Sequence, residues 1–155
     1  MSLMRNTIAA AAMLAALALS AHARAADAPC KLEISGNDLM QYDKTGLSAP
    51  ATCKEITVTL HHTGKLPKEA MGHNWVLVNA ADLVEVANAG LTAGLPNSYV
   101  PPGDKRVLAH TKTIGGGETT SVTFTTSILK KGGAYAYLCS FPGHNALMHG
   151  VFKFG

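Results

Sequence analysis

Short segments of alternating hydrophobic and polar residues follow one another along most of the chain, as is typical of β-strands with one buried face. In the segment 54–62, Ile56, Val58, Leu60 and His62 share one face, so we expect His62 to point into the core. The same pattern predicts strands at 31–35, 54–62, 73–78, 106–110, 119–126, 134–139 and 149–154. This succession indicates an all-β protein.

Residues that favour turns separate these segments, notably at 35–38, 100–104 and 115–117. Strands broken only by turns predict a sandwich rather than alternating strands and helices. One interruption is helical: Asn79 can cap a helix, apolar residues follow at helical spacing, and Gly90 can end it. The expected fold is a β-sandwich with one short helical insertion.

The N-terminal stretch has a different character. Arg5 gives it a basic start, an apolar run covers 8–19, and small residues follow, which is the pattern of a cleaved secretory signal peptide. The run is shorter than the about 20 residues that span a bilayer. Cleavage after Ala23 or after Ala25 fits, and Ala25 is favoured. We predict a signal peptide at 1–25 and one exported, periplasmic domain at 26–155.

The charge of the exported domain and the removal of the signal peptide each argue against one class of partner. Without residues 1–25, which hold Arg5, Arg24 and no acidic residue, 11 basic side chains face 10 acidic ones, a formal net charge of +1. Such balance gives no reason to expect nucleic acid binding. Once the signal peptide is removed, no membrane partner is expected either. A soluble protein, most simply a monomer, is the prediction.

The three cysteines make an odd number, and an exported chain meets an oxidising compartment. Cys30 and Cys53 are the natural disulfide pair because both lie early in the exported domain. Cys139 is left over near the C-terminus, so it calls for another explanation.

Cys139 opens the densest group of potential metal ligands, Cys139-Ser-Phe-Pro-Gly-His144-Asn-Ala-Leu-Met148. A thiolate, an imidazole and a thioether suit copper in both oxidation states, whereas calcium would need carboxylates, which this segment lacks. Copper held by cysteine also needs a second imidazole, for which His73 is the best candidate. Alone, each residue would more simply be core or surface; their spacing favours a metal site.

Several motifs in the exported domain resemble the azurins, a branch of the cupredoxin or type 1 blue-copper family. They are Met71-Gly-His-Asn-Trp-Val-Leu77, Ala109-His-Thr-Lys112, Ser121-Val-Thr-Phe124 and the Cys-x4-His-x3-Met loop length. The resemblance covers essentially all of the domain from Cys30 onward. It implies a Greek-key β-sandwich of about eight strands.

The resemblance also implies the roles of single residues. His73, Cys139 and His144 would hold one copper ion, Cu(I) or Cu(II), with Met148 weakly axial and the Gly72 carbonyl oxygen approaching from the other side. Cys30 and Cys53 match the family disulfide. Asn74 and Ser140 match positions whose hydrogen bonds hold the ligand loops near the thiolate.

Three further positions follow from the resemblance. His62 aligns with a histidine close to the copper and is a candidate for pH-linked behaviour; the alternative is a neutral, hydrogen-bonded core histidine. Tyr137 stands where phenylalanine is frequent, so its hydroxyl needs a partner or water. Thr63 replaces a common proline, which leaves the behaviour of that turn open.

By the same resemblance the protein is a single-electron carrier rather than an enzyme, and electrons would leave through His144. A ring of apolar residues would form a docking patch for redox proteins such as c-type cytochromes, copper nitrite reductase or amine dehydrogenase. The ring consists of Met40, Leu66, Met71, Phe141, Pro142, Ala146 and Leu147. The alternative interpretation of this ring is that its members are scattered exposed hydrophobic residues without a binding role. The alternative function for the protein is that of a copper chaperone or storage protein.

Overall fold

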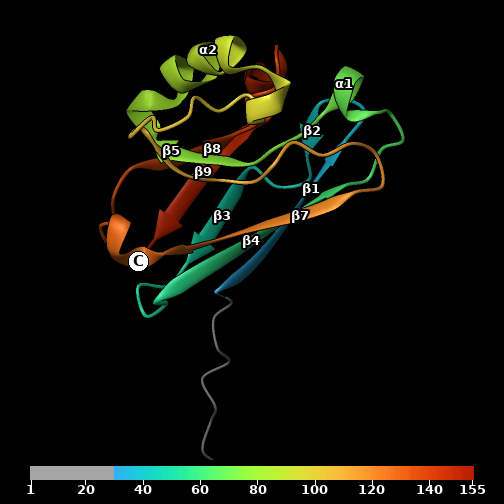
Figure 1. Ribbon diagram of the computed structural model, residues 1–155. Helices are drawn as coiled ribbons and strands as arrows, with labels where there is room; N and C mark the ends of the chain where they lie inside the picture. The colour runs from blue at the N-terminus through green and yellow to red at the C-terminus, as the bar shows by residue number, and fades with distance from the viewer. Residues whose placement is uncertain (1–29) are drawn as a thin grey trace, which may run out of the picture.

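The computed structural model describes residues 30–155, which form two β-sheets packed face to face (Figure 1). The predicted signal peptide, residues 1–25, lies outside this part of the chain, as do residues 26–29 of the predicted exported domain. Within residues 30–155, no helix is both long enough and apolar enough to cross a membrane.

The strands divide into a four-stranded and a five-stranded sheet. The first, in the order β2-β1-β4-β7, contains β1 (Lys31–Asn37), β2 (Gln41–Tyr42), β4 (Glu55–His62) and β7 (Thr119–Thr125). The second, in the order β3-β9-β8-β5-β6, contains β3 (Gly46–Ala49), β5 (Val76–Asn79), β6 (Val107–His110), β8 (Tyr135–Leu138) and β9 (His149–Phe154). β1 runs parallel to β4 and β3 parallel to β9; the other pairs are antiparallel. The predicted all-β sandwich is confirmed, with nine strands.

Burial along β4 follows the predicted alternation. Ile56, Val58 and Leu60 are fully buried and His62 is 2% exposed, so His62 does face the core. Trp75, also fully buried, lies at the centre of the aromatic packing between the sheets. The two apolar faces therefore close on one another, as alternating strands require.

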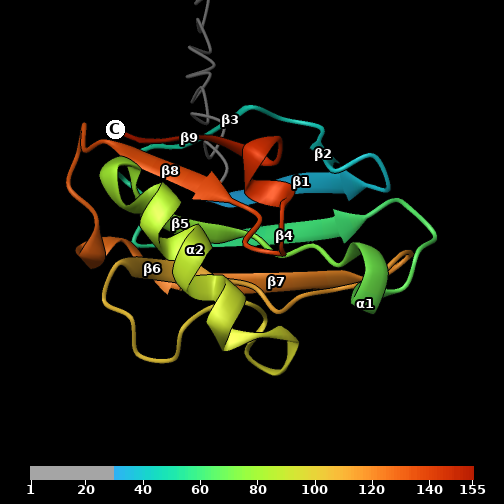
Figure 2. The ribbon, with the colours of Figure 1, turned by 90° about the horizontal axis from the view of Figure 1, so that it is seen from above.

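The predicted helix is present but has other ends. Asn79 closes β5, a 3-10 turn (Ala80–Asp82) follows, and α2 runs over Leu83–Ala93, past Gly90. Gly90 does not end the helix; it lets the helix approach the loop beyond it, because a Cβ there would lie 2.3 Å from the Tyr99 carbonyl oxygen. Val86 and Ala87 pack on the five-stranded sheet, which α2 covers (Figure 2).

Several elements were not predicted from the pattern. β2 and β3 are short strands in the stretch between Asn37 and Cys53, and α1 (Lys68–Met71) is a single turn. Three more 3-10 turns lie at Leu95–Asn97, Thr126–Ile128 and His144–Ala146. The stretch 35–38, expected as a turn, continues β1 as far as Asn37. These segments are too short for a sequence period to develop.

Candidate metal centre

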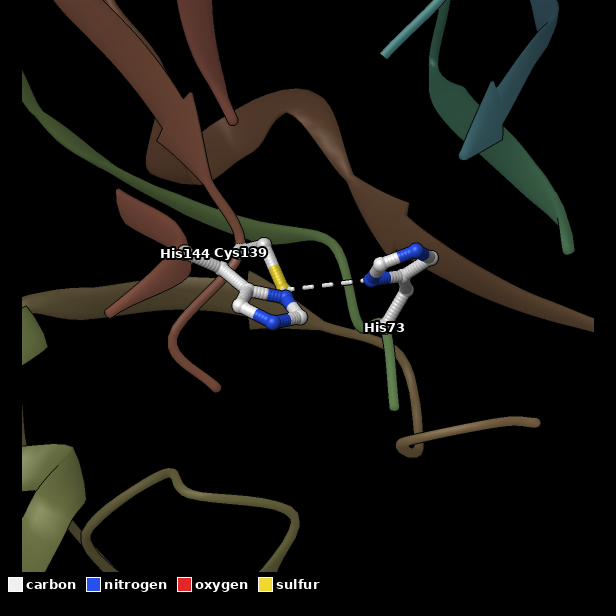
Figure 3. A group of neighbouring side chains, drawn as sticks. All are labelled: His73, Cys139 and His144. Carbon is white, nitrogen blue, oxygen red and sulfur yellow. Dashed lines mark hydrogen bonds between the residues drawn. The ribbon is translucent and has the colours of Figure 1, made fainter. Parts of the chain in front are cut away.

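The structure brings His73, Cys139 and His144 together, although 66 residues separate the first two (Figure 3). The Cys139 sulfur lies 4.0 Å from Nδ1 of His73 and 3.7 Å from Nδ1 of His144. The three potential ligand atoms all lie within 4.8 Å of one another, and all three residues are buried. Ligands about 2.0–2.3 Å from a shared ion must have this order of separation. One metal ion fits the group.

A single C-terminal loop supplies two of the three ligands. Cys139 directly follows β8, His144 begins the turn His144–Ala146, and Met148 directly precedes β9. Because β8 and β9 are antiparallel neighbours, the loop returns to its start, and the Cys139 N–H donates to the Met148 carbonyl at 2.9 Å. Met148 is fully buried beside Cys139 and Phe141.

The third ligand comes from the segment between α1 and β5. His73 is fixed by two backbone hydrogen bonds with Ile114, at 3.0 and 2.9 Å. Its Nε2 lies 2.8 Å from the Asn37 carbonyl oxygen, which can only accept, so Nε2 carries the proton. Nδ1, which faces the Cys139 sulfur, is left with a free lone pair. β1, which ends at Asn37, thus orients a ligand on another segment.

Asn74 joins the two ligand-bearing segments. Its side-chain oxygen accepts the Ser140 N–H at 2.9 Å, and its amide nitrogen donates to the Ser140 hydroxyl at 2.8 Å and to the Ser98 carbonyl at 2.6 Å. Hydrogen bonding from its backbone also acts to lower the pKa of the Cys139 thiol, against the larger effect of burial. Residues adjacent to both ligands are therefore held to each other by buried bonds, which limits movement of the site.

Burial controls protonation in the metal-free site. It raises the pKa of the Cys139 thiol to about 11, although hydrogen bonds from the Asn74 and Phe141 backbones act in the opposite direction. Burial also lowers the pKa of His144 to about 4, and it lowers the pKa of His73. At neutral pH the site holds two neutral imidazoles and a thiol, so a metal ion must displace the thiol proton.

The donor set indicates which metal fits. The three ligands are a sulfur and two imidazole nitrogens, and no carboxylate belongs to this group. Such a set suits copper, whereas calcium and magnesium need oxygen ligands. The Gly72 carbonyl oxygen lies 3.9 Å from the Cys139 sulfur, on the same segment as His73. The predicted axial roles of Gly72 and Met148 stay predictions.

His62 lies directly against a ligand. Its ring stacks on that of His73 with centroids 4.2 Å apart and planes 16° from parallel. Its Nδ1 accepts the Gly64 N–H at 3.1 Å, and its Nε2 lies 2.8 Å from the Met71 carbonyl oxygen. Both nitrogens are satisfied in one neutral tautomer. The link between its protonation and the metal centre stays a prediction.

The seven residues of the predicted docking patch differ in exposure. Leu66 and Leu147 are 42% and 61% exposed, and Pro142 and Ala146 are exposed as well. Met40 and Met71 are half-buried. Phe141 is buried and packs on the His144 ring, with centroids 4.5 Å apart. Phe141 therefore adds little to the exposed surface that the prediction assumed, and the patch itself stays a prediction.

The remaining predicted positions also have defined partners. Cys30 and Cys53 form the expected disulfide, and Cys139 is a free thiol. The Tyr137 hydroxyl, which needed a partner, donates to the Lys44 carbonyl at 2.7 Å. Thr63 donates its hydroxyl to the Gly36 carbonyl at 3.0 Å, a bond that proline could not make.

Sequence reasoning missed Gly36, Asn37 and Ser98. A Cβ at Gly36 would lie 2.7 Å from the His73 ring and 3.1 Å from the Met148 methyl group, so only glycine lets β1 approach the site. A glycine at a core-facing position of an alternating strand could have signalled this approach. Asn37 and Ser98 act through backbone carbonyls, which no side-chain pattern reveals.

Comparisons with known proteins agree with this geometry. A family model described as copper binding proteins, plastocyanin/azurin family, matches residues 28–154. Azurin-1 of Alcaligenes xylosoxydans xylosoxydans is 57% identical over 126 residues, which cover 81% of this chain and 98% of that protein. Azurin of Bordetella pertussis is 53% identical over 126 residues, covering 81% of this chain and 84% of the relative.

A solved structure is similar as well. It is that of an azurin, Az-iso2, from the obligate methylotroph Methylomonas sp. strain J, with a TM-score of 0.78 and 49% sequence identity. The match covers 81% of this chain and 98% of that one.

Proposed function

The chain belongs to the plastocyanin/azurin family of copper-binding proteins, and we propose on this basis that it is a periplasmic carrier of single electrons. The observation that supports the proposal best is the buried set of His73, Cys139 and His144, preassembled by hydrogen bonds between distant segments. A copper ion bound there would supply the one-electron couple Cu(I)/Cu(II).

The chain's own residues would do three things for this chemistry. His73, Cys139 and His144 would hold the ion, with Met148 and the Gly72 carbonyl oxygen as weak axial contacts. Asn74 and the Asn37 carbonyl would keep the ligands in place in both oxidation states. The burial of all three ligands would exclude water. A site that changes little between oxidation states favours electron exchange over substrate chemistry.

The exposed apolar surface supports a role with redox partner proteins. Pro142, Ala146 and Leu147 are exposed on the loop that carries His144, and Leu66 is exposed as well; an exposed apolar surface suits brief docking through a small interface. We propose that electrons pass through His144 and that the protein acts as a monomer. The c-type cytochromes, copper nitrite reductase and amine dehydrogenase are the partner classes to test first.

We also propose that the protein is exported and that His62 links its metal centre to pH. Residues 1–25 would be the signal peptide and 26–155 the copper-binding domain of the periplasmic protein. The Cys30–Cys53 disulfide is consistent with an oxidising compartment. His62, stacked on His73, would be the position through which pH acts on the centre.

The test is the visible spectrum of the copper-loaded protein. Oxidised wild type should be intensely blue, and Cys139→Ser should lose the colour because an alcohol oxygen cannot replace a soft thiolate. His110→Gln is a matched control: it removes an exposed imidazole at the end of β6, outside the ligand loop, and should keep the colour. A colourless oxidised wild type would rule out the proposal, and reversible voltammetry would separate a carrier from a chaperone that holds only Cu(I).

A further inference from the structure

Two tyrosines, the fully buried Tyr137 and the partly buried Tyr42, lie in contact between the sheets and use their hydroxyls in the same way. The rings of Tyr42 and Tyr137 meet edge to face, with centroids 5.7 Å apart. Each hydroxyl donates to a backbone carbonyl: that of Tyr42 to Asn74, and that of Tyr137 to Lys44. Only Tyr42 therefore binds the segment that carries a metal ligand.

The Tyr42 bond holds a residue that controls the thiolate. Asn74 follows His73 directly and precedes the fully buried Trp75, and hydrogen bonding from its backbone acts to lower the pKa of the Cys139 thiol. Its side chain is bonded to Ser140 and to the loop at Ser98. Its carbonyl has the Tyr42 hydroxyl as partner. The Tyr42 hydroxyl thus holds the Asn74 carbonyl, and the Ser98 and Ser140 bonds hold its side chain, so the backbone of Asn74 has little freedom to rotate.

Tyr42 is suited to act as a permanent donor. Burial raises the pKa of its phenol well above the usual value, and the nearby Cys139 thiolate acts in the same direction. The hydroxyl therefore keeps its proton at neutral pH. The ring also packs against the apolar group formed by Cys139, Phe141 and Met148. A change at the Tyr42 hydroxyl is thus a change beside the metal centre.

We propose that Tyr42 is a positioning residue of the metal centre: its hydroxyl fixes the Asn74 backbone and thereby the hydrogen bond from Asn74 N–H to the Cys139 thiolate. The inference rests on the proposed blue-copper function. A hydrogen bond to the thiolate stabilises negative charge on sulfur. The sulfur holds more of that charge when the metal is reduced. The Tyr42 hydroxyl therefore raises the reduction potential.

The experiment compares Tyr42→Phe with Tyr137→Phe. Each variant removes one buried hydroxyl and leaves one backbone carbonyl without its donor, while both keep the aromatic contact. Tyr42→Phe should lower the reduction potential and move the visible band to longer wavelength, because a thiolate with a weaker hydrogen bond gives up electron density more easily. In the metal-free protein, amide exchange at Asn74 should become faster. Tyr137→Phe should leave all three properties at their wild-type values.

The outcomes separate the inference from a structural effect and from the proposed function. Equal shifts in both variants would show that loss of any buried hydroxyl disturbs the site, and no shift in Tyr42→Phe would show that Asn74 is held without it. Either result overturns the role of Tyr42. Wild-type protein that lacks the blue colour would instead overturn the proposed function. Urea unfolding of both variants shows that they are compared as folded proteins.

Discussion

Burial of the ligand histidines predicts that the metal-free protein loses stability in mild acid. Burial lowers the pKa of His144 to about 4, and the neighbouring imidazoles of His73 and His62 act in the same direction. The pKa of His73 is lowered too, again with burial as the first cause. The imidazoles of His144 and His73 therefore resist protonation in the folded protein at pH values where the unfolded chain accepts protons readily.

The sign and size of the effect follow from proton linkage. An imidazole in the unfolded chain titrates near 6.5, whereas His144 in the fold titrates near 4. Between these values the unfolded state binds more protons, so the free energy of unfolding falls as pH falls. Above pH 6.5 both forms are neutral and nothing is lost. A shift of about 2.5 units at about 1.4 kcal/mol each makes the full loss about 3 kcal/mol, complete near pH 4.

Urea unfolding of the metal-free protein between pH 4.5 and 7.5 measures this loss. His144→Gln replaces the buried imidazole by a side chain that does not titrate, and the variant should lose most of the slope. His110→Gln removes an exposed imidazole from β6, outside the ligand loop, and should keep the slope of the buried group. The carboxyls of Asp38, Asp43 and Asp104 also have a lowered pKa. The stability that they contribute is lost mainly as pH falls below the usual value of 3.8, outside the range of the experiment.

Copper-loaded protein provides the complementary measurement. Imidazole nitrogens that bind a metal cannot accept a proton, so the loaded protein should show no such slope until the metal is released. Metal-free wild type that is equally stable at pH 4.5 and 7, or a slope that survives unchanged in His144→Gln, would refute the reasoning from burial.

Three further predictions concern other parts of the protein. Met148→Leu should stay blue but have a higher reduction potential, since loss of a weak axial donor disfavours Cu(II); an unchanged potential would exclude an axial Met148. Thiol titration of the unfolded, unreduced apoprotein should find one free thiol, and three thiols would disprove the Cys30–Cys53 bridge in solution. Because the bridge joins residues with a sequence separation of 23, its loss should lower the free energy of unfolding by about 3 kcal/mol. Leu66→Glu should slow electron exchange with the spectrum intact, whereas Ile128→Glu, equally exposed at the far end of β7, should not; equal rates in the two variants would count against the patch.

The parts of the fold that the sequence predicts are those in which many residues repeat one pattern. Alternation over the eight residues of β4 was enough to place Ile56, Val58, Leu60 and His62 inside, because each position supports the same orientation. The two residues of β2 and the four of β3 carry no comparable pattern. Their pairing depends on partners distant in sequence, so only the folded chain reveals it.

The candidate site divides in the same way. The chemistry of His73, Cys139 and His144 is visible in their side chains and spacing, which is why sequence reasoning found them. What holds them is largely backbone: Asn37 orients a ligand through its carbonyl oxygen, and Gly36 acts by having no side chain. Sequence patterns report on side chains. The role of a backbone carbonyl group, or of a missing side chain that leaves room for a neighbour, is therefore seen only in the folded structure.

The protonation state of the metal-free site explains how the fold can be built before the metal arrives. Burying a thiolate without a cation would be costly, but the pKa of Cys139, about 11, keeps the sulfur protonated, and the buried imidazoles are neutral. The fold thus buries three uncharged groups, and the thiolate forms only when a metal ion replaces the proton. Because Asn37 and Asn74 already hold the ligand segments, the arriving ion meets a frame that needs little rearrangement. The same frame is what an electron carrier needs at every later change of oxidation state.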